Sequence, residues 1–434
     1  MFSIRRELRS IRTSPLARNA GWMVLGQGSG FLLQSAYFIL IARLLGPYEY
    51  GLYAGAFALT NIIGQYSSMG SGTVFLRYVS ADRQRYAVYW GNILFTTTTV
   101  SVAIIAGLAL ISGHLIGAGS RPILLLGAVA NCFCNQLTFA AARVFQTFEQ
   151  LRITAFLNLA TNFARTLAAA GMLVMLHHAS AYQWSIATVM VSMAATLAGV
   201  VTVTWRFGRP AFHLTQMKHD LPEGLGYSFA TSTSTAYNDI DKTMLSHYGM
   251  NVANGIYTMA YRIVDVATIP VVAIREAAMP RFFKRGLIGI AGSAELAAKL
   301  LKRTIPLGLL AMAAIFLTAP LVPHLVGQGF RETVLALRWL CIIPVFRSIH
   351  QMTGSAMTGS GLQKYRTVSQ VLAVILNVAL NLWLIPSHGW LGAAWSSLWT
   401  DGMLAVLNCS ALALMCRFAA GILVAGTQEG SRKL

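Results

Sequence analysis

The sequence predicts an all-α polytopic membrane protein with about 12 transmembrane helices in two parallel-repeated six-helix lobes. The first reason is composition: 56% of the 434 residues are hydrophobic and 11% are charged, whereas soluble globular proteins carry about 25% charged residues. The second is that apolar stretches of about 20 residues, which cross roughly 30 Å of hydrocarbon, recur along the whole chain. The third is that strongly basic connections alternate with connections that carry few basic residues.

The apolar stretches are expected to be helices, because backbone polar groups in lipid must be paired within their own segment. The first six predicted spans cover residues 18–42, 50–71, 87–111, 121–145, 153–176 and 181–205. The last six cover residues 223–247, 253–279, 303–326, 334–357, 365–386 and 390–416. We expect no enzyme activity, metal or other cofactor, because the connections leave no room for a soluble catalytic domain.

These spans divide the chain into five predicted segments. They are a basic cytoplasmic N-terminus at 1–17, an N-lobe at 18–205, a cytoplasmic linker at 206–222, a C-lobe at 223–416 and a cytoplasmic tail at 417–434. The linker, RFGRPAFHLTQMKHDLP, lies at the midpoint of the chain and contains proline, histidine and charged residues. This composition is typical of a connection between two halves.

The distribution of charge predicts the orientation in the membrane. A net charge of +19 is common in proteins that bind nucleic acid, but the basic residues here sort by connection. If the N-terminus is cytoplasmic, 24 of the 33 Lys and Arg residues lie in cytoplasmic segments or at the adjoining ends of spans, three lie likewise on the opposite face, and six lie elsewhere within spans. The positive-inside rule therefore predicts that both termini are cytoplasmic. The partner of these basic connections is expected to be the anionic lipid bilayer and not nucleic acid.

One cytoplasmic connection, near residues 280–302, leaves two interpretations open. Its sequence AELAAKLLK places leucines on one side of a helix and Lys299 and Lys302 on the other. This pattern is typical of a short helix that lies on the membrane surface. An ordinary basic connection explains it equally well.

The two halves of the chain share a pattern of a span, a glycine-bounded turn with a nearby tyrosine, a second span and a basic exit. The matching residues, each offset by 204 positions, are Gly51 and Gly255, Tyr53 and Tyr257, and Arg77 and Arg281. An even number of spans per half keeps both halves in one orientation, which predicts a parallel repeat about an axis along the membrane normal. Two such lobes can rock about a central cavity.

The turn after the first span carries a family resemblance. Residues 42–53, ARLLGPYEYGLY, resemble the corresponding segment of polysaccharide-export flippases, the Wzx-type O-antigen and capsule translocases. These belong to the multidrug/oligosaccharidyl-lipid/polysaccharide (MOP) superfamily. The other residues that fit are Gly70, Gly72, Arg77, Tyr78, Asn238–Lys242, Gly255, Tyr257, Pro270 and Pro280. Lipid II flippases are related but resemble the chain less, since they have an Arg-Asp pair in helix 1 and two further helices.

The resemblance covers essentially the whole chain and implies both a fold and an activity. The implied fold is MATE-like, with two six-helix lobes around a V-shaped central cavity. The implied activity is the movement of undecaprenyl-pyrophosphate-linked oligosaccharide from the cytoplasmic to the outer leaflet of the bacterial inner membrane, for polysaccharide biosynthesis. We expect a monomer that works by alternating access, because two lobes already enclose one pathway.

Basic side chains within the spans are the first candidates for substrate binding. Each costs about 2.5–3.5 kcal/mol at the centre of a span on insertion scales, so it must face water, snorkel or pair. Guanidinium groups suit a pyrophosphate, because their planar fork can bond two oxygens. The candidate substrate-binding residues are Arg165, Arg347, Arg262, Lys242 and His350. Snorkelling is the favoured interpretation for the basic residues near span ends, which are Lys242, Arg275 and Arg338.

Acidic side chains within the spans are candidates for coupling to a H⁺ or Na⁺ gradient. They are Asp239, Asp241, Asp265 and Asp401. The first and third have basic neighbours at i,i+3 spacing, Lys242 and Arg262, so local ion pairs explain them equally well. No charged residue lies within one turn of Asp401, which makes it a functional candidate or a partner of Arg347 or Arg165.

Two other functions remain alternatives. An ion-coupled multidrug exporter of the same fold would use intramembrane acids to transport organic cations, whereas the excess of basic residues in these spans favours an anionic substrate. A membrane-bound glycan polymerase or ligase would need a long outward loop with paired catalytic groups. The outward connections here have only about 5–10 residues, which argues against that class.

Overall fold

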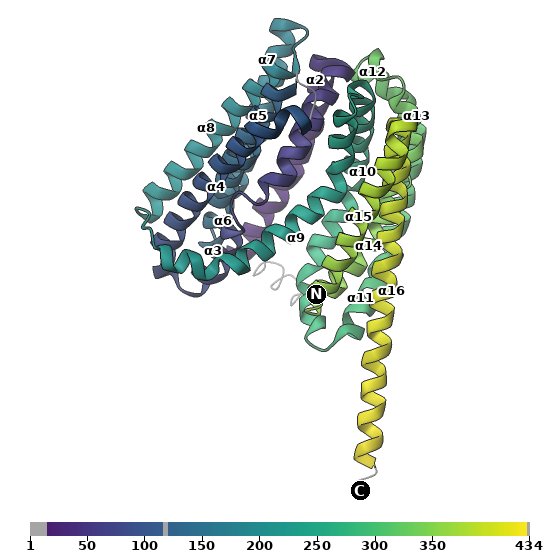
Figure 1. Cartoon of the computed structure of the whole chain (residues 1–434). Coiled ribbons are helices and arrows are strands. Elements are labelled where there is room, and N and C mark those ends of the chain that lie inside the picture. The colour runs from purple at the N-terminus through teal and green to yellow at the C-terminus, as the bar shows by residue number, and fades with distance from the viewer. Residues whose placement is uncertain (1–14, 116–119, 432–434) are drawn as a thin grey trace, which may run out of the picture. The chain divides into compact units, whose positions relative to one another are not determined.

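The computed structural model describes residues 15–115 and 120–431, so most of the predicted basic N-terminus lies outside the described residues. The described residues form helices and turns without any strand, as predicted. They divide into two compact units (Figure 1). Unit 1 comprises Met1–Thr235 and Ser246–Gly255, and unit 2 comprises Ala236–Leu245 and Ile256–Leu434.

The helices of unit 1 run side by side (Figure 1). They are α2 (Pro15–Gly64), α3 (Ser71–Ala81), α4 (Tyr86–Leu115), α5 (Arg121–Ala128), α6 (Asn135–Thr147), α7 (Leu151–Leu176) and α8 (Ala181–Phe207). A π-helical segment, Val129–Cys134, joins α5 to α6. The following helix, α9 (Leu214–His247), contributes residues to both units.

The helices of unit 2 follow after α9. They are α10 (Asn251–Gly286), α11 (Ile290–Thr318), α12 (Val322–Val326), α13 (Thr333–Leu340), α14 (Ile343–Gly359), α15 (Gln363–His388) and α16 (Trp390–Ser431). Among the described residues, nine helices are long and apolar enough to cross a membrane. The predicted spans 18–42, 50–71 and 223–247 are largely helical but are not among these nine. An exact count of 12 therefore stays a prediction.

Two predicted spans are interrupted, and backbone chemistry explains both breaks. The span predicted at 50–71 stops at Gly64, and α3 begins after Gly70, which has a φ of 68°. A Cβ on Gly70 would lie 2.1 Å from the carbonyl oxygen of Gly224, so only glycine allows this approach. The span predicted at 334–357 breaks after Leu340. In a continuous helix the ring of Pro344 would clash with the backbone carbonyl of Leu340, four residues earlier.

The predicted turn after the first span is confirmed at Gly46. Its φ of 67° and ψ of 174° interrupt α2 immediately before Pro47. The repeat-related glycines then meet in unit 1, where the helix after this turn crosses the first turn of α10. A Cβ on Gly51 would lie 1.9 Å from the Asn251 carbonyl oxygen, and one on Gly255 would lie 2.0 Å from the Pro47 carbonyl oxygen. Since 47 and 251 are also 204 positions apart, the two contacts are equivalent under the predicted repeat.

The connections of unit 1 alternate between its two ends as the charge pattern predicts. At one end, the guanidinium of Arg83 lies 5.6 Å from the ring of Phe148, which stacks on Phe207 with centroids 4.3 Å apart. These residues come from three predicted cytoplasmic connections. At the other end, the Ala181 amide donates to Glu49 Oε2 over 2.6 Å, which joins the start of the sixth predicted span to a predicted outward connection.

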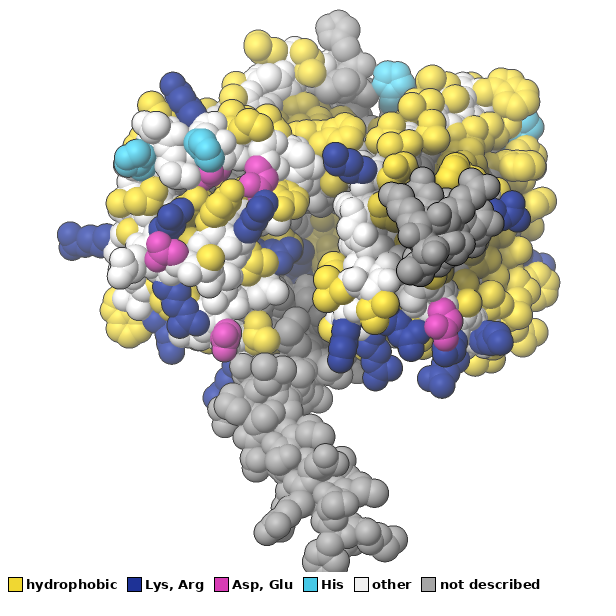
Figure 2. All heavy atoms as spheres, turned by 90° about the horizontal axis from the view of Figure 1, so that it is seen from below, with side chains coloured by type: hydrophobic (Ala, Val, Ile, Leu, Met, Phe, Trp, Pro, Cys, Tyr) yellow, Lys and Arg dark blue, Asp and Glu magenta, His cyan; other side chains and the backbone are white. Residues whose placement is uncertain are grey.

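Unit 2 shows the same alternation. A Cβ on Gly286 would lie 2.0 Å from the Gly359 carbonyl oxygen, so two predicted cytoplasmic connections meet. At the opposite end, Trp390 Nε1 donates to Glu332 Oε2 over 3.0 Å. The view from below in Figure 2 shows Lys and Arg side chains well in excess of Asp and Glu, as expected for faces that carry the cytoplasmic connections.

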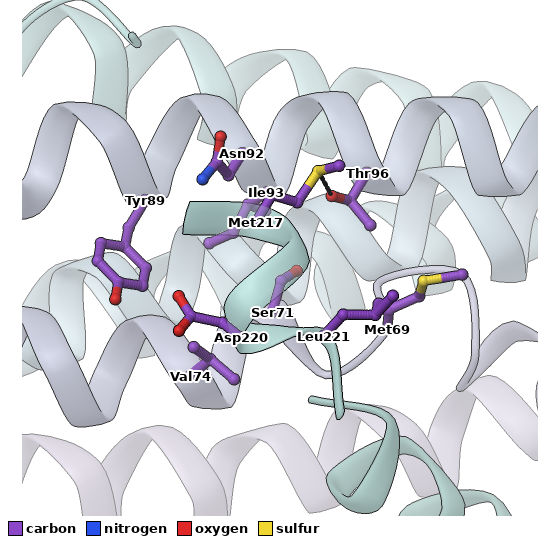
Figure 3. Close-up of a pocket in the computed structure, with 10 residues that line it drawn as sticks. All are labelled: Met69, Ser71, Val74, Tyr89, Asn92, Ile93, Thr96, Met217, Asp220 and Leu221. Atoms are coloured by element: carbon purple, nitrogen blue, oxygen red, sulfur yellow. Dashed lines mark hydrogen bonds between the residues drawn. The ribbon is translucent and has the colours of Figure 1, made fainter. Parts of the chain in front are cut away.

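The predicted linker is held against unit 1. The backbone amide of His213 donates to Asn92 Oδ1 over 3.0 Å, and Asn92 Nδ2 donates back to the His213 carbonyl over 3.3 Å. Figure 3 shows the pocket of about 380 Å³ that this packing leaves between α3, α4 and the start of α9. The carboxylate of Asp220, which lines this pocket, already accepts a hydrogen bond from Gln216 Nε2 over 2.9 Å. We interpret this pocket as part of the anchor for the linker.

The stretch AELAAKLLK lies in the first turns of α11 and continues into the ninth predicted span. Leu296 is buried in a cluster with Phe282 and Met357, so it packs on neighbouring helices and does not lie against lipid headgroups. The hydrophobic side of this stretch is covered by α10 and α14. Neither a separate surface helix nor an irregular loop describes it.

Candidate functional site

Most of the predicted site residues gather in one polar cluster inside unit 2. Four helices supply it: the last turns of α9, and α10, α14 and α16. The cluster contains the predicted residues Asp239, Asp241, Lys242, Arg262, Asp265, Arg347, His350 and Asp401. Charged groups inside a span are costly, so each of them requires a partner.

Asp265 joins two of the predicted guanidinium groups. Arg347 Nη1 lies 2.7 Å from Asp265 Oδ1, and Arg262 Nη1 lies 3.4 Å from Asp265 Oδ2. Arg347 is 7% exposed and also donates to Asn238 Oδ1 over 3.4 Å. The local Arg262–Asp265 pair within α10 is therefore confirmed, but Arg347, which lies on α14, shares the same carboxylate.

Lys242 does not snorkel, contrary to our expectation. It is 2% exposed, and its Nζ lies 2.5 Å from Asp239 Oδ1 and 2.7 Å from the Asn238 carbonyl oxygen. The ammonium also lies 4.7 Å from the ring centroid of Tyr261, and the Arg347 guanidinium lies 5.2 Å from the same ring. The aromatic face thus stabilises two buried cations by cation–π attraction.

Asp241 is fully buried and bound by hydroxyl groups. Its Oδ2 accepts hydrogen bonds from the Tyr257 hydroxyl and from Ser397 Oγ, the latter over 3.2 Å. Its Oδ1 accepts from the backbone amide of Lys242 over 2.7 Å. Tyr257 is the tyrosine of the predicted repeat, so this repeated position serves to hold a buried carboxylate.

The ion-pair contact of Asp401 is with His350 and not with an arginine, which corrects the predicted partners. His350 Nε2 and Asp401 Oδ1 are 3.2 Å apart, and the two side chains are 5% and 2% exposed. Their angles fall outside hydrogen-bond geometry, so neither of these atoms has a hydrogen-bond partner among the described residues. A proton taken up at this position would join the two groups.

The charges of this cluster nearly balance, which the sequence pattern did not show. Three permanent cations face four carboxylates, and His350 is the additional group that can become charged. Sequence reasoning also missed the residues that hold these groups in place, which are Tyr257, Tyr261, Ser397 and Asn238. Tyr257 and Asn238 already stand in the quoted motifs, so the motif positions were a signal for them.

Arg165 is different because it lies in unit 1 without an acidic partner. Its Nη2 donates to Asn135 Oδ1 and to Ser192 Oγ, each over 3.1 Å. Asn135 Nδ2 donates in turn to Asn131 Oδ1 over 2.8 Å, and Asn131 lies in the π-helical segment that directly precedes Asn135. None of the described carboxylates forms an ion pair with Arg165, and its Nε is buried without a described partner. A guanidinium held by neutral groups keeps its full charge for an anion.

Comparison with known proteins identifies the fold. The family described as polysaccharide biosynthesis protein matches residues 16–285. An inward-facing multidrug resistance MATE family transporter of the MOP superfamily has a TM-score of 0.72 and 15% identity, covering 89% of this chain and 96% of that chain. Lipid II flippase MurJ, in an inward closed conformation, has a TM-score of 0.72 and 13% identity, covering 91% of this chain and 87% of that chain.

A MOP superfamily transporter from Pyrococcus furiosus is also similar, with a TM-score of 0.62 and 15% identity over 92% of this chain and 96% of that chain. No curated protein sequence matches the chain significantly. At such identities these structures establish the fold and not the substrate. The predicted MATE-like fold is therefore confirmed.

Proposed function

Because the chain belongs to the polysaccharide biosynthesis protein family, within the MOP superfamily, we propose that it flips an undecaprenyl-pyrophosphate-linked oligosaccharide from the cytoplasmic to the outer leaflet. The family and the fold make the chain a membrane transporter that acts in polysaccharide biosynthesis. The lipid-linked substrate is supported by the family and by the fold shared with a lipid II flippase. Its pyrophosphate, the direction of movement and alternating access belong to the proposal.

Arg165 is the observation that carries this proposal. A pyrophosphate brings roughly two negative charges into a low-dielectric region, where an unpaired charge is costly. Arg165 offers a guanidinium that is oriented by Asn135 and Ser192 but not neutralised by a carboxylate. A cation compensates for the removal of an anion from water, and the fork of arginine fits two phosphate oxygens.

The cluster in unit 2 has a different proposed part. Lys242, Arg262 and Arg347 already hold carboxylates, so they bind a substrate anion only if those pairs rearrange. Asp401 and His350 can take up a proton without breaking an arginine–aspartate pair. We therefore assign ion coupling to this pair in preference to the other acidic candidates.

Lipid translocation in proteoliposomes tests the proposal. Undecaprenyl-pyrophosphate-linked oligosaccharide is placed in one leaflet, and its appearance in the other is followed for wild type, Arg165→Ala and Arg338→Ala. Arg338 is a matched control, because it is an exposed basic residue whose guanidinium lies over the Phe316 ring. We expect translocation by wild type and Arg338→Ala, and a loss of about 100-fold in Arg165→Ala, the range of about 3 kcal/mol for a lost charged contact. Equal rates in the wild type and both variants would remove Arg165 from the pathway.

A multidrug exporter is the second candidate, favoured by the buried carboxylates Asp241 and Asp401 and by the MATE fold. It predicts uptake of a cationic dye driven by a proton or sodium gradient, lost in Asp401→Asn. It also predicts that the lipid-linked oligosaccharide stays in its original leaflet. Dye transport without lipid movement would replace the flippase proposal.

A further inference from the structure

A recess at the cytoplasmic end of unit 1 is separate from both polar networks. It lies between the start of α7 and the end of α8, and its volume, including the part open to solvent, is about 890 Å³. Gln150, Arg152, Ile153, Phe156 and Arg206 line it. All five lie within unit 1, so among the described residues this unit alone supplies the lining of the recess.

One wall of the recess is suited to a phosphate group. Arg152 and Arg206 bring two guanidinium groups from two different helices, and none of the described acidic side chains forms an ion pair with Arg206. The recess also lies at the N-terminal end of α7, whose dipole favours negative charge. Gln150 has a buried Oε1 without a described partner, and rotation of this amide would present an N–H donor in its place.

The other wall is suited to hydrocarbon. Ile153 lies in the first turn of α7, and Phe156, in the next turn, is 67% exposed. On α8, Trp205 is 85% exposed and immediately precedes Arg206. An exposed tryptophan beside basic residues at a helix end is typical of the membrane–water interface. The recess thus presents charge toward the headgroup level and apolar surface toward the bilayer core.

A soluble phosphate would use only one of these walls, whereas an amphipathic ligand uses both. We propose that the recess binds the phosphate of a membrane lipid in the cytoplasmic leaflet, with its hydrocarbon chain along Ile153 and Phe156. Its ligand is the polyprenyl pyrophosphate substrate before translocation, an identity that rests on the proposed function. Phosphatidylglycerol is the other source of the same chemistry, and the experiment separates the two.

Lipid binding in nanodiscs tests this site. The double variant Arg152→Gln/Arg206→Gln is compared with Arg209→Gln/Lys218→Gln, which removes the same charge from nearby exposed positions that do not line the recess. Photo-reactive undecaprenyl pyrophosphate, phosphatidylglycerol and free inorganic pyrophosphate are titrated onto each. We expect undecaprenyl pyrophosphate to bind the wild type and the control variant with equal affinity. Its affinity for the recess variant should be about 10-fold lower. Free pyrophosphate should bind weakly to all three proteins.

Three results would overturn the inference. Equal losses in the two double variants would mean that only surface charge matters. Unchanged binding in the recess variant would mean that the site lies elsewhere. Phosphatidylglycerol binding as tightly as undecaprenyl pyrophosphate would remove the assignment to the substrate.

The transport assay separates this site from the proposed function. A loading site predicts that the recess variant needs about 10-fold more substrate for half-maximal translocation while its maximal rate is unchanged. If wild type translocates the lipid and the recess variant behaves identically, the recess alone is excluded. If wild type does not translocate the lipid at all, the proposed function fails. Matching thermal unfolding curves establish that the exposed substitutions leave the fold intact.

Discussion

At the scale of single residues, partners decide what a charge inside this protein can do. Arg165 and Arg347 have the same side chain and similar predicted depth, yet one is held by an amide and a hydroxyl and the other by a carboxylate. The first retains a net positive charge, whereas the second contributes to a nearly neutral cluster. The same substitution is therefore expected to affect transport at Arg165 and stability at Arg347.

Asp265→Asn tests the structural part of this distinction. It leaves the buried Arg347 without a charged partner, and such losses cost about 3–5 kcal/mol for a fully buried pair. Because Asp265 is 34% exposed, we expect a smaller loss of about 1–3 kcal/mol in thermal unfolding.

The double variant Asp265→Leu/Arg347→Met is expected to recover part of this stability, because no unpaired charge remains. Glu295→Gln provides a control, since its ion pairs with Lys299 and Arg285 are exposed to solvent, which screens them, and contribute little to stability. If Asp265→Leu and Arg347→Met, each measured alone, add up strictly to the effect of the double variant, the pair does not interact.

Tyr257→Phe tests the support of a buried carboxylate. The substitution removes the hydroxyl that donates to Asp241 and leaves the ring in place. We expect a destabilisation of about 1.5–3 kcal/mol, the range for hydrogen bonds to charged groups. Its repeat-related partner, Tyr53→Phe, serves as the control in thermal unfolding. A loss at Tyr257 no larger than the loss at Tyr53 would mean that the hydrogen bond to Asp241 contributes little to stability.

At the scale of elements, glycine positions decide where helices break and where they cross. Gly46 ends the first helix through a left-handed φ, and Gly51 and Gly255 let two helices approach until backbone atoms touch. These two glycines are equivalent in the repeat. Their shared role explains why glycine recurs at this position of the repeat. Each half supplies the glycine that lets the backbone of the other half's turn approach closely.

Gly255→Ala is expected to destabilise unit 1. Its methyl group would lie 2.0 Å from the Pro47 carbonyl oxygen, so the helices must separate, and overpacking of this kind costs about 1–3 kcal/mol or more. Gly171→Ala is the matched control in α7, because nothing lies within 4 Å of the added methyl. We expect that variant to be up to about 1 kcal/mol more stable. Thermal unfolding of both variants measures the difference, and a stable Gly255→Ala protein would contradict the close crossing.

At the scale of the whole molecule, the basic residues predict a topology that the connections within each unit obey. Reporter fusions test it across the entire chain. We expect alkaline phosphatase to be active when fused after Gly249 or Gly327 and inactive after Gly289 or Gly361, because only the first two positions lie in predicted outward connections. A fluorescent protein at the C-terminus should fluoresce. Activity after Gly361 would require a different number of spans.

The sequence by itself determined the class of this protein, because hydropathy and charge are sums over long segments. Composition, span length and basic connections were sufficient to predict a polytopic helical fold. The Gly-x-Tyr repeat was sufficient to predict that the two halves of the sequence are related. Local ion pairs at i,i+3 spacing, such as Asp239 with Lys242, were also visible, because one helix fixes both residues.

Only the tertiary structure decided which charges neutralise one another. Hydropathy does not fix the rotation of a helix about its axis, so the contacts of Arg347 with Asp265 and of Asp401 with His350 were not predictable from spacing. The same reason explains the expectation that Lys242 snorkels, which failed because Asp239, Asn238 and Tyr261 enclose its ammonium group. The residues of the candidate site were named by the sequence, but their division into one free guanidinium and one balanced cluster depends on packing between helices.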